Sequence, residues 1–263
     1  MRDHQHLFRG MCNKCDEGCV EFLHPDDEEV KVTAPCKTCK CAIVEHRVVE
    51  LNPRESQSVD LIRDVFDHVE ISEIINASIN DTIRLNISRE FLTYGEINEL
   101  AFPAILRQAK PQPGEVFYDL GTGSGKPAIL ACALFPFAKA IGIELLPTVT
   151  EIANRMAKRY EQLRGKYELT EQSVDLEFKC QDLLQSDFSE ADVIYIASTC
   201  FDIPFMEKIS ARSKDLKPGT RIITLKNPMP SLGEQNIGFE LIHDKKYVMS
   251  WGWEHVYVQV KLQ

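Results

Sequence analysis

The sequence predicts an α/β protein with a doubly wound sheet, closed by a C-terminal antiparallel pair of strands and preceded by a small zinc-binding segment. Three observations on its 263 residues support this prediction. Short apolar runs alternate with stretches of helical spacing after residue 110, as in doubly wound sheets. A glycine-rich loop follows the first of these runs, and two strand-like runs with no helix between them end the chain.

The composition is that of a globular protein, with 44% hydrophobic and 27% charged residues. A formal net charge of -10 argues against sequence-blind binding to nucleic acid, which depends on phosphate neutralisation, so no direct nucleic-acid binding is predicted. The sequence has no apolar run of about 20 residues that could span a membrane, and its first residues lack a signal-peptide core. We therefore expect an intracellular protein of the nucleus or cytoplasm, without a membrane partner.

Residues 1–51 form a cysteine-rich segment, which holds six of the nine cysteines. Two C-x2-C pairs separated by twenty residues match a four-thiolate zinc site, in which a tetrahedral ion replaces the core that a short segment cannot build. The predicted ligands are Cys12, Cys15, Cys36 and Cys39, with Cys19, Cys41 and His46 as further candidates. The alternative is that the last three are ordinary thiols and a surface histidine. The segment either positions a substrate protein or is a structural cap.

Residues 52–110 are expected to form a helical connector. Apolar residues recur with helical spacing between Ser58 and Asn80, and a break is expected near Glu70. This spacing indicates helices that pack on the following domain.

Residues 111–263 form the predicted ligand-binding domain. The strand 115–120 opens after Gly114, and a helix extends from the glycine loop to Leu134. The strand 138–145 precedes a long amphipathic helix, 148–164.

The second half of this domain continues the alternation. Residues 174–180 and the apolar run 192–197 are expected strands, followed by a helix over 203–216. The turn Lys217-Pro218-Gly219 leads into the strand 221–225. Residues 239–251 and 254–262 are the closing pair.

The glycine loop Gly121-Thr122-Gly123-Ser124-Gly125 indicates where a ligand binds, because the crevice of such sheets lies beyond the carboxyl ends of the strands. Acidic residues accompany it: Asp119 before the loop, Glu144 at the end of the next strand and Asp182 after the third. A phosphate-binding loop is disfavoured, because Leu120 and Pro127 replace residues that it requires. A dinucleotide site prefers GxGxxG, and a plain tight turn is the remaining alternative. A methyl-donor site fits the whole pattern best.

The stretch Asp119–Gly125, followed by Gly142-Ile143-Glu144, resembles motif I and the next acidic position of class I S-adenosylmethionine-dependent methyltransferases. More narrowly, Leu92–Ile97 resembles the YGE signature of the Dot-one (disruptor of telomeric silencing) histone-lysine methyltransferases. The runs 192–196, 217–223 and 249–251 are further matches. The resemblance covers residues 85–262, and its glycine loop alone identifies only the superfamily.

This resemblance implies a class I methyltransferase fold with S-adenosylmethionine as the methyl donor. In the family's pattern, Glu144 holds the ribose, Asp182 and Leu183 frame the adenine, and Thr93 and Tyr94 help to form a lid. The implied donor site comprises Thr93, Glu96, Asp119, Gly121, Thr122, Gly123, Gly125, Glu144, Asp182 and Leu183. The implied catalytic residues are Tyr94, Ser198 and Phe201.

One stretch departs from the family. Its Asn-Asn-Phe-x-Phe motif is replaced here by Ala197-Ser198-Thr199-Cys200-Phe201, so that Ser198 is the candidate substitute for the first asparagine. Cys200 is expected to be a packing thiol rather than a nucleophile. Phe201, Trp251, Trp253 and Tyr257 are candidate walls of an apolar channel for a lysine.

The predicted function is protein-lysine N-methylation, with a protein substrate that includes histone as a candidate. An in-line attack by an amine on a methylsulfonium needs neither a metal nor a covalent intermediate, so that positioning supplies much of the rate. Two alternatives stay open: a methyltransferase for a small molecule or a non-histone protein, and a non-catalytic zinc-containing interaction module that retains the fold.

Overall fold

The computed structural model describes residues 9–12, 46–48, 51–87, 95–167, 169, 174–235, 237–249 and 251–262. Near the N-terminus, β1 (Arg9–Cys12) pairs antiparallel with β2 (His46–Val48), and the register places Cys12 opposite His46. The other candidate zinc ligands lie outside the described residues: Cys15, Cys19, Cys36, Cys39 and Cys41.

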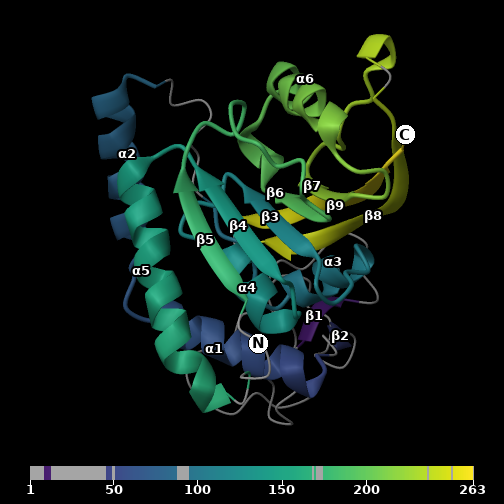
Figure 1. Cartoon of the computed structure of the whole chain (residues 1–263). Helices are drawn as coiled ribbons and strands as arrows, with labels where there is room; N and C mark the ends of the chain where they lie inside the picture. The colour runs from purple at the N-terminus through teal and green to yellow at the C-terminus, as the bar shows by residue number, and fades with distance from the viewer. Residues whose placement is uncertain are drawn as a thin grey trace.

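The described residues form a sheet of seven strands in the order β5-β4-β3-β6-β7-β9-β8 (Figure 1). Its parallel strands are β3 (Val116–Leu120), β4 (Lys139–Glu144), β5 (Asp175–Cys180), β6 (Val193–Ile196) and β7 (Arg221–Leu225). The hairpin of β8 (Phe239–Met249) and β9 (Gly252–Lys261) joins antiparallel to β7. The predicted doubly wound sheet with a closing antiparallel pair is therefore confirmed.

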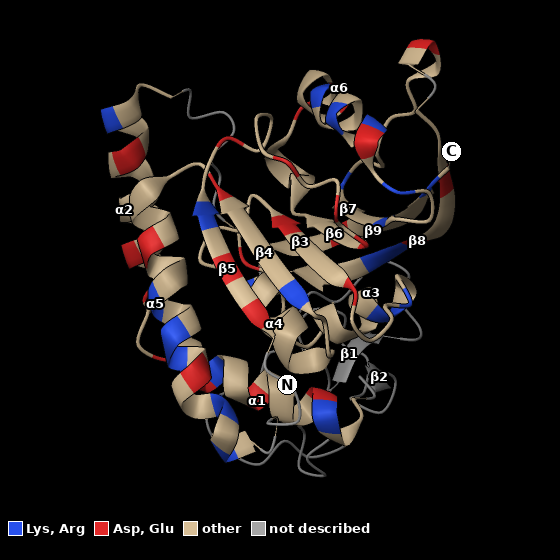
Figure 2. Ribbon diagram, viewed as in Figure 1, with Lys and Arg blue, Asp and Glu red and all other residues tan. Residues whose placement is uncertain are grey.

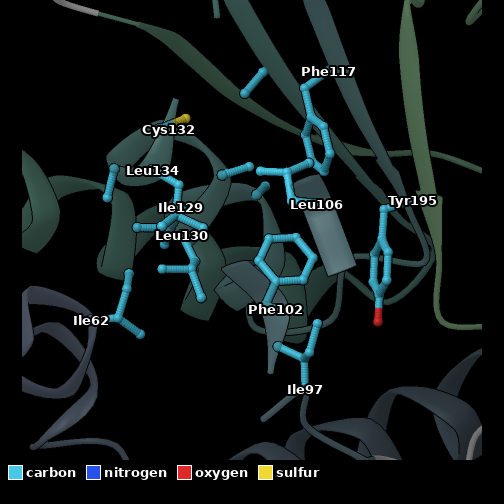
Figure 3. Close-up of a cluster of buried hydrophobic side chains, with 14 of the residues drawn as sticks. Ile62, Ile97, Phe102, Leu106, Phe117, Ile129, Leu130, Cys132, Leu134 and Tyr195 are labelled. Atoms are coloured by element: carbon cyan, nitrogen blue, oxygen red, sulfur yellow. The ribbon is translucent and has the colours of Figure 1, made fainter. Parts of the chain in front are cut away.

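The central strands are apolar on both faces because helices cover both faces of the sheet. Residues 117 and 195 belong to one buried cluster, whereas 118 and 194 belong to the other. This alternation is the period of two expected of a strand. Figure 3 shows the first cluster, in which the ring of Phe102 meets Tyr195 edge-on at 5.4 Å between centroids.

The helical spacing predicted between Ser58 and Asn80 corresponds to two helices, with the break where it was expected. Helix α1 (Pro53–Phe66) begins with a capping box, in which Asn52 and Glu55 exchange hydrogen bonds between side chain and backbone. Helix α2 (Ile71–Leu85) begins after Glu70. The buried side chain of Asp81 fastens α2 to Thr148, because it accepts hydrogen bonds from the backbone N–H (2.6 Å) and the hydroxyl (2.8 Å) of that residue.

Helices α3 (Phe102–Gln108), α4 (Lys126–Leu134) and α5 (Pro147–Leu163) follow, and α6 (Ile203–Arg212) covers the opposite face of the sheet (Figure 1). Short 3-10 turns occupy Arg164–Tyr167, Ser198–Cys200, Ser213–Asp215 and Gly233–Gln235. In the part of the chain that the structure describes, no helix combines the length and apolar character needed to cross a bilayer.

Candidate active site

A cavity of about 310 Å³ lies at the carboxyl ends of the parallel strands, which is within the usual size range of small-molecule sites. In Figure 2 the ribbon is coloured red, for acidic residues, near the carboxyl ends of β3 and β4, which hold Asp119 and Glu144. Its walls come from the glycine loop, the segments after β4, β5 and β6, and the segment that precedes α3. The predicted site residues on these walls are Glu96, Gly121, Thr122, Gly123, Glu144, Asp182, Leu183 and Phe201.

The glycine loop needs its glycines for two reasons. Gly121, Gly123 and Gly125 have φ values of 80°, 56° and 83°, in the left-handed region that other residues avoid. A Cβ on Gly125 would also lie 2.5 Å from the ring of Phe178, which packs beneath the loop. The loop is held to β4 by hydrogen bonds from the N–H groups of Gly121 and Thr122 to the carbonyl of Ile143.

Asp119 is fully buried beneath this loop and does not form part of the cavity wall. Its Oδ2 accepts a hydrogen bond of 2.6 Å from the hydroxyl of Thr122, but its Oδ1 has no partner among the described groups. Burial raises the pKa of Asp119 to about 7, and hydrogen bonds from Thr122 and the backbone of Ala128 only partly oppose this rise. Among the described residues, no Lys or Arg forms an ion pair with this buried carboxyl group.

This arrangement predicts that Asp119→Asn stabilises the protein at neutral and alkaline pH. A carboxyl whose pKa is raised from 3.8 to about 7 by folding contributes stability below pH 4, and this contribution is lost as the pH rises through 7. The neutral amide avoids that loss, so urea unfolding at pH 8 is expected to show a gain of about 4 kcal/mol that vanishes near pH 4. The exposed Asp175→Asn is the control, and a gain independent of pH would contradict this account.

Glu144 ends β4 and organises the backbone around the cavity. Its Oε2 accepts a hydrogen bond from the N–H of Gly123 at 2.9 Å, and its Oε1 accepts from Leu145 and Leu146 at 2.8 and 3.0 Å. Burial raises the pKa of Glu144, against the effect of these backbone donors. One carboxylate therefore ties the glycine loop to the segment that starts α5 and lines the cavity.

Asp182 and Leu183 line the cavity beyond β5, close to Glu144. The backbone N–H of Gln181 donates to the carbonyl of Glu144 at 2.8 Å, which fixes the two segments together. Asp182 Oδ1 accepts from the N–H of Leu184, and Leu183 belongs to the cluster on the α6 face. The structure thus brings the predicted ribose and adenine residues to the same side of the cavity.

Lys126 and Glu96 form an ion pair of 2.6 Å at the cavity wall, with side chains only 13% and 11% exposed. The sequence analysis predicted Glu96 but missed Lys126, which follows the last glycine of the loop. The ammonium also lies 5.2 Å from the centre of the Phe66 ring. A cation and an anion therefore face the same end of the cavity.

The segment after β6, for which the sequence predicted catalytic residues, forms another part of the cavity wall. Ala197, Thr199, Cys200 and Phe201 line the cavity, and Phe201 packs on Phe205 with centroids 4.8 Å apart. Cys200 is partly exposed at this wall, so the thiol is not buried as expected.

Ser198 is not brought to the cavity. It is completely buried, and its hydroxyl donates to the carbonyl of Leu225 at 2.6 Å and accepts from the N–H of the same residue at 3.0 Å. These bonds fasten the turn after β6 to β7. The expectation that Ser198 offers its hydroxyl in place of the family's asparagine therefore finds no support in this geometry.

The remaining predicted residues differ in their positions. Thr93 and Tyr94 lie outside the described residues. Trp251 is 40% exposed and packs on the backbone at Gly95, where an added Cβ would lie 2.5 Å from the indole. Trp253 and Tyr257 do not line the cavity, and Tyr257 stacks on His255 instead. Gly125, the last glycine of the loop, does not line the cavity.

The sheet order, the glycine loop and the acids at the strand ends define a class I methyltransferase fold. A putative RNA methyltransferase from Pyrococcus horikoshii has the same fold, with a TM-score of 0.51 and 12% identity; the superposition covers 81% of this chain and 100% of that one. At this identity the likeness concerns the fold alone.

Within that class, the chain belongs to the family described as histone methylation protein DOT1, whose sequence profile matches residues 78–251. A relative from Caenorhabditis elegans, named histone-lysine N-methyltransferase, H3 lysine-79 specific, is 33% identical over 138 residues, which cover 51% of this chain and 15% of the relative. A relative of the same name from Eremothecium gossypii is 26% identical over 243 residues, covering 83% of this chain and 42% of the relative. The chain thus spans less than half the length of these curated relatives, and its resemblance to the Dot-one branch is confirmed.

Proposed function

We propose that this protein is an S-adenosylmethionine-dependent methyltransferase that modifies a lysine of a protein, with histone H3 as the first candidate. The observation that carries the proposal is the family match over residues 78–251, because this range contains the described walls of the cavity. The curated relatives in this family are named as histone H3 lysine-79-specific enzymes. A histone substrate would require the protein to act in the nucleus.

The residues of the cavity fit the proposed donor. Glu144 Oε2 accepts only one of the described backbone N–H groups, so that it keeps an acceptor site for a ribose hydroxyl, and Asp182 offers acceptors for an adenine amino group. Asp119 supplies a buried negative charge with one unsatisfied oxygen, and Lys126 supplies a positive charge for a carboxylate. When bound, the donor supplies a methyl group on a positively charged sulfur.

The acceptor amine would approach past the wall after β6. Ala197, Phe201 and Phe205 make this wall largely apolar, and an apolar surrounding lowers the pKa of a lysine by disfavouring its charged form. The lysine would then reach the donor as the neutral amine. Ala197 has no hydrogen-bonding side chain, so that this chain positions the acceptor mainly by shape.

We also propose that residues 1–51 bind zinc. The support is the spacing of the two C-x2-C pairs, together with the register that sets Cys12 opposite His46 at the backbone level. A thiolate site would fold this short segment and let it position the substrate protein. Metal analysis of the purified protein should find at least one zinc per chain; the absence of zinc would refute this part of the proposal.

A different acceptor is the second candidate function, and the loss of the family's asparagine at Ala197 favours it. This change removes an amide from the cavity wall, where Ser198 does not replace it. A small molecule or a non-histone protein would then receive the methyl group through the same donor site.

Transfer of a labelled methyl group distinguishes these acceptors. The intact protein is incubated with methyl-labelled S-adenosylmethionine and, separately, with nucleosomes, free histones, soluble cell protein and a metabolite fraction. Label on histone H3 is the expected result. Label only on another protein or a metabolite would favour the second candidate, and donor binding without transfer to any fraction would favour the non-catalytic interaction module.

A further inference from the structure

Tyr195 is a buried tyrosine beside the candidate donor site that the sequence analysis did not assign. It lies in β6 directly opposite Asp119 of β3 in the parallel register. Paired residues of neighbouring strands direct their side chains to the same face of a sheet, so the phenol and the carboxylate lie on one face. Tyr195 also lines the cavity, and Asp119 lies beneath the glycine loop beside it.

The Tyr195 hydroxyl has no hydrogen-bond partner among the described groups, although the side chain is completely inaccessible. A phenylalanine would fill the same space without this hydroxyl, and the ring already packs edge-on against Phe102 (Figure 3). Leaving a buried polar atom unsatisfied costs free energy, so such atoms are rare in folded proteins, and one at a cavity wall is a candidate for contact with a ligand. Core packing therefore accounts for the ring of Tyr195 but not for its hydroxyl.

A second unsatisfied atom lies on the same face, namely Oδ1 of Asp119. The two groups interact electrostatically, since the charge of Asp119 contributes after burial to raising the pKa of Tyr195. The phenol therefore stays neutral and keeps a proton to donate. Lys126 and Glu96 form the ion pair on the neighbouring wall of this cavity. Tyr195, Lys126 and Glu96 thus line the cavity with groups able to pair with an amino acid, and Asp119 lies buried on the face of the sheet that carries Tyr195.

We propose that the Tyr195 hydroxyl recognises the α-amino-acid end of the methyl donor, with Asp119 as its partner on the ammonium side. This inference rests on the proposed donor site. It assigns to that site a residue that contacts the ammonium or carboxylate of the donor rather than its nucleoside. A neutral phenol accepts from an ammonium or donates to a carboxylate, and either contact satisfies its hydroxyl. Tyr195 is therefore a specificity residue for donors that carry this end.

Binding calorimetry with two ligands tests the assignment. S-adenosylmethionine has the amino-acid end, whereas 5′-methylthioadenosine shares the nucleoside and sulfur but lacks it. Tyr195→Phe is expected to weaken S-adenosylmethionine about tenfold, the size of a lost hydrogen bond to a charged group, and to leave 5′-methylthioadenosine unchanged. The melting temperature of the ligand-free variant should equal or exceed that of the parent, because the variant removes an unsatisfied hydroxyl.

Thr224→Val is the matched control. The Thr224 hydroxyl is likewise buried without a described partner, but Thr224 does not line the cavity. Its removal should affect the affinity for neither ligand. Equal weakening of both ligands by Tyr195→Phe, or no weakening of either, would overturn the assignment while the donor site stands. If the parent protein binds neither ligand, the proposed function fails and the assignment fails with it.

Discussion

Replacing Glu144 with alanine is expected to weaken binding of S-adenosylmethionine at least a hundredfold. The carboxylate accepts hydrogen bonds from the N–H groups of Gly123, Leu145 and Leu146, and it lines the proposed ribose site. Alanine removes the contact to the ligand and leaves three backbone donors without their acceptor, and among these the N–H of Leu146 is buried. Each unsatisfied donor costs about 1 to 3 kcal/mol, so both affinity and folding stability should fall.

Glu144→Gln separates these two effects, because the amide keeps the shape and one acceptor oxygen but loses the charge. Binding calorimetry and urea unfolding on both variants give affinity and stability independently. The matched control is Glu151→Ala, an exposed glutamate of α5, which should change neither quantity. Affinity of Glu144→Ala within threefold of the parent protein would show that the ribose contact is assigned to the wrong residue.

Gly125→Ala is expected to lower the free energy of unfolding by about 3 kcal/mol or more and to abolish donor binding. The residue has φ of 83°, which costs any L-residue about 1 to 2 kcal/mol. In addition, the new Cβ would lie 2.5 Å from the ring of Phe178 and 3.2 Å from Ala153. Relief of this overlap has to move the glycine loop or the ring beneath it, and the loop forms the cavity wall.

Gly219→Ala isolates the backbone contribution, since Gly219 has φ of 89° and no atom within 4 Å of an added Cβ. It should cost about 1 to 2 kcal/mol and leave donor binding intact. Equal losses of stability in the two variants, measured by urea unfolding, would mean that Phe178 does not constrain the loop.

The order of strands and helices could be predicted from the sequence because the central strands are short and apolar on both faces. The run VIYI is buried throughout β6 and VFYDL is buried in β3 from its second residue on, and the helices between strands keep helical spacing. The break at Glu70 was predictable because the helical spacing of the apolar residues changes there. Glycines and acids at strand ends located the cavity, because ligands bind at that edge of such sheets.

Side-chain partners at the cavity could not be predicted in the same way. Ser198 and Ala197 are adjacent in the sequence, but the 3-10 turn after β6 directs the serine into β7 and leaves the alanine at the cavity. The pairing of Lys126 with Glu96 joins segments thirty residues apart, which the sequence around either residue does not indicate. The contact of Trp251 with Gly95 likewise depends on how the closing hairpin packs.

A crystal structure of the intact protein with bound S-adenosylhomocysteine would test the donor site most directly. The account predicts that the ribose contacts Glu144, that the adenine lies between Glu144 and Asp182, and that the amino-acid end points toward Asp119, Tyr195 and Lys126. Ligand density elsewhere on the molecule, or the reverse orientation within the cavity, would contradict the assignment of this cavity and its residues.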